Sequence, residues 1–118
     1  MSAPTAKANG GGASGEAFSL VAAADGRYTA AGALTFATAR QARHLGEQLL
    51  AGAGNGAAAL EIDCHGITVA DSAGLAVLLD WLGAARRRGR TLRYTHLPTD
   101  LTALARISEV EELLERGV

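Results

Sequence analysis

The sequence predicts one α/β domain with a largely parallel sheet. Its 118 residues, 48% of them hydrophobic, suit a single domain with one core. The predicted elements follow the order β-β-α-β-α-β-α-α, and strands that alternate with helices imply crossover connections between parallel strands. Residues 1–16 are mostly small residues and glycines, which bury too little apolar area to offset the entropy of ordering. We therefore expect a flexible low-complexity tail over 1–16 and a folded domain over 17–118.

Four short segments have the composition of strands. They are residues 18–23, 27–31, 57–62 and 91–95. The first two flank the dipeptide Asp25-Gly26, which is typical of a tight turn, so they predict an opening β-hairpin. The third is a short apolar run of the kind found in buried parallel strands. Residues 64–71 are expected to form the loop that follows it.

Four segments have helical patterns. They are residues 38–51, 72–88, 99–107 and 109–116. The second is the strongest, because four leucines recur at i, i+3, i+4 and i+7 and form one apolar stripe. These leucines are Leu75, Leu78, Leu79 and Leu82. Thr38 and Ser108 are candidate N-caps of the first and last helices, and Pro98 precedes the third. The glycine-rich residues 52–56 are predicted to end the first helix in a loop.

The sequence contains none of the common constellations of an enzyme or a metal site. A GxGxxG loop after a strand is absent, and so is a GxxxxGK[ST] loop. His44, His65 and His96 fall in three different segments and form no HExxH motif or Cys-His cluster, so we expect neither a metal nor a cofactor. Cys64 follows Asp63, whose charge disfavours a thiolate, which favours a structural cysteine.

The start of the second helix is the best candidate for a functional site. Ser72 lies where a helix leaves its first amides unpaired. Its hydroxyl can cap those amides, and the same position also suits a phosphate group. The small Ala73 and Gly74 are expected to keep the surface around Ser72 uncovered, so that a partner's backbone can approach beside Asp71. On the residues alone, the cap is the favoured interpretation.

Two further features of this helix have alternative interpretations. Trp81 lies at the edge of the apolar stripe, so it is either a core residue or an interface anchor. The basic run 86–90 is either a phosphate or lipid-headgroup patch or a solvated helix end that complements the helix dipole. A run this short is a weak signal, and we favour the second interpretation for it.

The segment ITVADSAGLAVLLDWLGAARRRGRTLRY resembles the STAS domain, the module of bacterial anti-sigma-factor antagonists. The shared pattern is an acidic strand end followed by Asp-Ser/Thr-x-Gly-Leu at a helix start, and the resemblance covers about residues 18–114. It implies a mixed sheet with helices packed mainly on one side. The segments VADSAGLAVLLDWLGAARRRG and LPTDLTALARISEVEELL are similar to the MlaB-like branch of the family.

The MlaB-like resemblance implies a subunit without enzymatic activity. Such a subunit binds the cytoplasmic MlaF-like ATPase of an ABC phospholipid transporter and supports outer-membrane lipid asymmetry. The implied contact residues are Asp71, Ser72, Ala73, Gly74 and Trp81. The alternative is an anti-sigma-factor antagonist switched by phosphorylation of Ser72, because a partner kinase phosphorylates this position in antagonists.

Composition is consistent with a protein partner. The formal net charge of −1 gives no general reason to expect nucleic acid or an anionic membrane surface. No stretch is long and apolar enough to span a bilayer, and residues 1–15 lack the pattern of a signal peptide. We expect a cytoplasmic protein that meets the inner membrane only through the transporter complex.

Overall fold

The computed structural model describes residues 17–52 and 59–118. The predicted tail over 1–16 and most of the predicted loop over 52–56 lie outside the described residues. The elements, in chain order, are β2 (Ser19–Ala24), β3 (Arg27–Leu34), α1 (Ala39–Gly52), β4 (Ala59–Ala70), α2 (Ser72–Arg87), β5 (Thr91–Thr95), α3 (Thr99–Ile107) and α4 (Glu111–Arg116). Their order is the predicted one. Among the described residues, no helix is long and apolar enough to cross a membrane.

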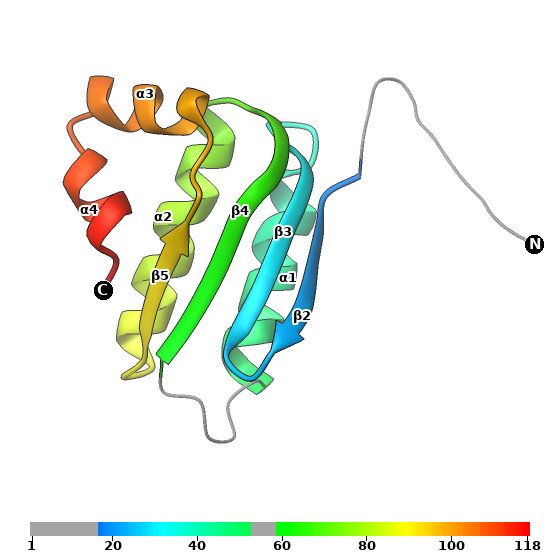
Figure 1. The fold of residues 1–118 in the computed structure, drawn as a ribbon. Helices are drawn as coiled ribbons and strands as arrows, with labels where there is room; N and C mark the ends of the chain where they lie inside the picture. Colours follow the sequence, from blue (N-terminus) through cyan, green and yellow to red (C-terminus); the bar gives the residue numbers. More distant parts are fainter. Residues whose placement is uncertain (1–16, 53–58) are drawn as a thin grey trace, which may run out of the picture.

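The sheet has the strand order β2-β3-β4-β5. β2 and β3 pair antiparallel as the predicted hairpin, whereas β3–β4 and β4–β5 pair parallel. Figure 1 shows α1 and α2 side by side along one face of the sheet, while α3 and α4 lie near β5. The mixed α/β fold with helices mainly on one side is therefore confirmed. The parallel pairing brings the carboxyl ends of β3 and β4 to the same edge of the sheet.

Alternation along the strands separates the core from the open face of the sheet. On β4, Leu60, Ile62 and Cys64 are buried, while Glu61 and Asp63 between them remain partly exposed. This period of two places every second side chain against the helices. On β5, a buried tyrosine also ties the sheet to a helix, because the Tyr94 hydroxyl donates to the Leu78 carbonyl of α2 at 2.6 Å.

The predicted loop over residues 64–71 is wrong, because β4 continues through it to Ala70. β3 is also longer than predicted, and the two strands stay paired up to Leu34 and Ala70. The pairing shifts register near Gly66, where an added Cβ would lie 3.0 Å from the Ala30 carbonyl oxygen. Glycine therefore lets β4 pass close to β3, and the strand continues where the sequence pattern suggests a break.

One predicted helix start differs from the structure, and another agrees with it. Ser108 is the C-cap of α3, and its N–H donates to the Leu104 carbonyl at 3.0 Å. The next residue, Glu109, has a φ of 63°, which turns the chain, so α4 begins only at Glu111. At α1, Thr38 occupies the predicted N-cap position, because it precedes the helix and its carbonyl accepts the N–H of Ala42 at 2.9 Å. Its hydroxyl donates back to the Ala33 carbonyl at 2.8 Å and closes the turn that precedes the helix.

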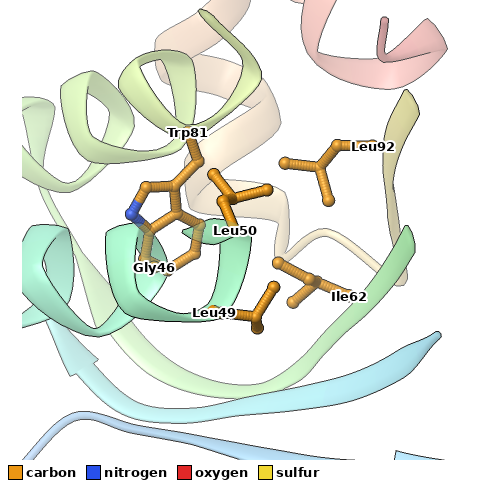
Figure 2. Close-up of a pocket in the computed structure, with 6 residues that line it drawn as sticks. All are labelled: Gly46, Leu49, Leu50, Ile62, Trp81 and Leu92. Atoms are coloured by element: carbon orange, nitrogen blue, oxygen red, sulfur yellow. The ribbon is translucent and has the colours of Figure 1, made fainter. Parts of the chain in front are cut away.

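Trp81 is a core residue, only 1% exposed. Figure 2 shows its indole lying over Gly46 of α1, with Leu50 beside it. Its ring centroid lies 6.1 Å from that of Phe18, and the apolar space around it is too small for a water molecule. The indole Nε1 has no hydrogen-bond partner among the described residues. Of the two interpretations of Trp81, the structure supports the core, and the expected anchor role is corrected.

Gly46 fixes the distance between α1 and α2. A Cβ built on Gly46 would overlap the Trp81 ring at Nε1 and Cε2. We predict that Gly46→Ala destabilises the protein by about 1–3 kcal/mol, the usual effect of overpacking, although alanine is the better helix former. Urea unfolding monitored by Trp81 fluorescence measures this.

The matched control is Gly83→Ala in α2, where the nearest atom to an added Cβ is the end of the flexible Arg87 side chain at 3.4 Å. That variant is expected to stabilise the protein by up to about 1 kcal/mol. Equal effects of the two substitutions would contradict a steric role for Gly46.

Candidate functional site

Asp71 caps α2 and joins it to a second loop. Its Oδ1 accepts the N–H of Gly74 at 3.1 Å, and its Oδ2 accepts the N–H of Phe36 at 3.0 Å. The first bond satisfies one of the amides that a helix start leaves unpaired. The expectation that Ser72 caps the helix is therefore wrong, since Ser72 is the first residue of α2 and its side chain is exposed.

Gly74 faces the sheet rather than a partner. It is buried, and a Cβ at this position would overlap the Leu34 carbonyl oxygen at the end of β3. The expectation that Gly74 keeps the outer surface uncovered is corrected: its lack of a side chain lets α2 approach the sheet closely. Ala73 is half-buried beside the exposed Ser72.

An exposed phenylalanine lies next to this helix start, and the sequence analysis missed it. Phe36 is 83% exposed in the β3–α1 connection, and Val69 near the end of β4 is 48% exposed. Leu34 pairs with Ala70 in the parallel ladder, which brings the carboxyl ends of β3 and β4 to one edge of the sheet (Figure 1). We call Phe36, Val69, Ser72 and Ala73 together the α2 N-terminal surface. A large aromatic residue in a connection of small residues and threonines was the available signal.

A polar cluster lies on the open face of the sheet, apart from the α2 N-terminal surface. Asp63 Oδ1 accepts the backbone N–H of His65 at 2.9 Å, and it lies 3.1 Å from His65 Nδ1 and 3.2 Å from His96 Nδ1. The backbone N–H of His65 is the main reason that the pKa of Asp63 lies below its ordinary value. The two histidines lie far apart in the sequence. Asp63 pairs with Thr95 in the parallel ladder, and this pairing brings the next residue, His96, close to Asp63.

The remaining candidates have structural or solvated surroundings. Cys64 is fully buried, and burial, followed by the nearby Asp63 charge, raises its pKa to about 12. The structural interpretation of this cysteine is thus supported, because the reactive thiolate is disfavoured. In the basic run 86–90, Arg86, Arg87 and Arg88 are exposed at the end of α2, whereas Arg90 is half-buried. Within the part of the chain that the structure describes, no group of three His, Cys, Asp or Glu residues is arranged to hold a metal ion.

Fold and site together define a STAS-type domain. A solved structure titled "Structure of the Anti-Sigma Factor Antagonist SpoIIAA in its Unphosphorylated Form" is similar, with a TM-score of 0.59 over 77% of this chain and 83% of that one. The two sequences are 14% identical, so this likeness concerns the fold. The family model described as "Mlab, STAS domain" matches residues 21–115, and the chain belongs to this family. STAS domains mediate protein–protein interactions. No protein of curated function matches the sequence.

The cap geometry predicts which residue of the helix start carries stability. Asp71→Ala removes both hydrogen bonds of the carboxylate, and we expect it to destabilise the domain by about 1–2 kcal/mol. Ser72→Ala removes an exposed hydroxyl and is expected to change stability by less than about 0.5 kcal/mol. Thermal unfolding of both variants measures this. A larger loss for Ser72→Ala would show that serine is the cap.

The Asp63 cluster predicts a pH dependence of stability. Folding lowers the pKa of Asp63, so its ionised form stabilises the fold above its unfolded pKa of about 4. That contribution is lost as the pH falls through the lower folded-state pKa. We expect Asp63→Asn to be less stable than the parent at pH 7, with the gap closing toward pH 2. Urea unfolding across this range measures the gap, and a constant gap would contradict a role for the ionised carboxylate.

Proposed function

We propose that this protein is a non-enzymatic STAS subunit that docks on the MlaF-like ATPase of an ABC phospholipid transporter. The docking region is the α2 N-terminal surface. In this role the protein is cytoplasmic, peripheral to the inner membrane through the complex, and supports the assembly or activity of a transporter that maintains outer-membrane lipid asymmetry. The observation that carries the proposal is the match to the MlaB family model over residues 21–115.

The geometry of the helix start favours binding over catalysis. Ser72 is exposed, but the neighbouring carboxylate has both oxygens engaged by backbone N–H groups. Asp71 therefore holds two segments together through both of its oxygens. An activated nucleophile needs a base that is free to accept its proton. A fixed surface with an exposed hydroxyl and an exposed apolar ring suits contact with another protein.

One observation favours a second candidate function. Ser72 is the first residue of a 16-residue helix and is accessible to a kinase. The positive end of the helix dipole stabilises an added phosphate. A similar solved structure is named as an anti-sigma-factor antagonist in its unphosphorylated form. The alternative is thus an antagonist whose binding to an anti-sigma kinase is switched at Ser72. The two functions differ in the partner.

The proposal predicts co-purification with the ABC ATPase encoded in the same genome, when the two are expressed together. Ser72→Glu is expected to weaken the complex at least tenfold, because a charge then faces the partner across a desolvated contact. The domain should stay folded, since acidic groups are favourable at a helix start. Affinity is measured by calorimetry or interferometry, with unfolding measured in parallel.

Gln48→Glu is the control, because it adds one negative charge on an exposed position near the opposite end of α1. It should leave binding unchanged. A protein that fails to bind the ATPase but captures a serine kinase of the anti-sigma type would overturn the transporter proposal in favour of the alternative.

A further inference from the structure

We infer that Phe36 is the apolar anchor of the docking surface and that Asp71 is its positioning residue. The inference rests on the proposed function and deepens it, because it states what the partner must offer. That partner is the transporter ATPase, with an uncharged, apolar pocket of aromatic-ring size next to its contact with Ser72.

Phe36 differs from the other phenylalanine of the chain in its surroundings. Phe18 is 2% exposed in the core, whereas Phe36 is 83% exposed. A phenylalanine ring brings a large apolar area, and burying it at an interface yields more free energy than burying a smaller residue. Exposed apolar residues also occur singly, but Phe36 shares its sheet edge with the exposed Val69.

The backbone of Phe36 is held from both sides. Its own N–H donates to Asp71 Oδ2 at 3.0 Å. Before it, the N–H of Thr35 donates to the Thr38 hydroxyl at 3.0 Å, and that hydroxyl donates to the Ala33 carbonyl at 2.8 Å. The N–H of Thr38 in turn donates to the Thr35 carbonyl at 3.0 Å. The ring is therefore presented from an ordered turn, which lowers the entropy lost on binding.

The charges around the ring define the chemistry of the partner. Phe36, Val69, Ser72 and Ala73 carry no charge themselves, whereas the Asp71 carboxylate, engaged by two backbone N–H groups, lies beside them and the exposed Arg40 follows in the first turn of α1. The ring itself offers no counter-ion, so a charged group set against Phe36 would lose its hydration without compensation. An apolar pocket that takes the ring, beside a polar group for the Ser72 hydroxyl, fits the surface.

The first test is Phe36→Ala, measured as affinity for the ATPase. We expect a loss of at least tenfold, typical of an aromatic hot spot. The melting temperature should hardly change, since the ring contacts mostly solvent. The matched control is Val21→Ala, which removes an exposed apolar side chain from β2. Val21 pairs with Thr29, five residues before Leu34 on β3, or about 16 Å along the strand. It should leave affinity unchanged.

The second test separates positioning by Asp71 from its capping of the helix. Asparagine is as good an N-cap as aspartate, but its side chain has one acceptor oxygen instead of two. Asp71→Asn should therefore keep the fold, release the Phe36 amide and weaken binding about fivefold, as expected for one hydrogen bond. Hydrogen exchange at the Phe36 amide should become faster, a change that a merely structural role would not produce selectively.

A double variant completes the test. If Asp71 acts through the ring, Asp71→Asn should have no further effect on affinity in the Phe36→Ala background. Additive effects would overturn the positioning role. A parent protein that binds the ATPase while Phe36→Ala binds equally well would overturn the anchor and leave the docking proposal intact. A parent that does not bind the ATPase would overturn both. If Phe36→Ala instead abolished self-association or vesicle binding of the free protein, the ring would serve a second copy or a lipid surface.

Discussion

The Asp71 carboxylate joins two segments that lie 35 residues apart in the chain, and the candidate site depends on this junction. One oxygen holds the first turn of α2 and the other holds the β3–α1 connection. In a pair of parallel strands, the connections that follow the two strands both leave the sheet at the same edge. Some group has to bind these two connections together. A carboxylate does this well because it accepts two backbone N–H groups through charge-assisted hydrogen bonds. The arrangement of Ser72 and Phe36 then follows from the hydrogen bonds that Asp71 accepts from the backbone of their two segments.

Glycine contacts fix α2 along its length. Near its start, Gly74 allows the helix to meet the end of β3, and near its middle Trp81 packs against Gly46 of α1. Any side chain at either glycine would push α2 away from its neighbour, and Ser72 would move with the helix. At these two positions glycine lowers the intrinsic stability of the helix, but it allows α2 to pack more closely on its neighbours. The unpartnered Trp81 Nε1, within the described residues, is consistent with a contact determined by shape.

The sequence predicted elements well where one periodicity continued without interruption. β5 and α3 have the predicted bounds, Thr91–Thr95 and Thr99–Ile107, because their apolar spacing and the flanking proline are unambiguous. The second half of β4 was missed, since Gly66 and the partly polar residues around it resemble a loop until the pairing with β3 is known. Pairing register also explains why the approach of His96 to Asp63 was not predicted.

The candidate site was also predicted from the sequence only in part. The motif located the helix start correctly, but it assigned the cap to Ser72 instead of Asp71. Both side chains are ordinary N-cap residues, and only the backbone decides which one precedes the helix. The exposure of Phe36 depends on where the connection runs after β3, and no local pattern determines that.

The surroundings of Ser72 bear on both proposed functions, a permanent contact and a phosphorylation switch. A negative charge on Ser72 is favoured by the α2 dipole and disfavoured by the neighbouring Asp71 carboxylate, so the two effects oppose each other within one turn. The fold is therefore expected to change little when Ser72 is modified. Partner binding is expected to change more than the fold when Ser72 is modified. A phosphate on Ser72 would be a strongly hydrated group at the same sheet edge as the exposed Phe36 ring. A partner whose pocket excludes water around that ring would reject the charged form. Under both proposed functions, the nature of the partner's pocket, and not a rearrangement of the domain, decides whether Ser72 acts as a simple contact or as a switch.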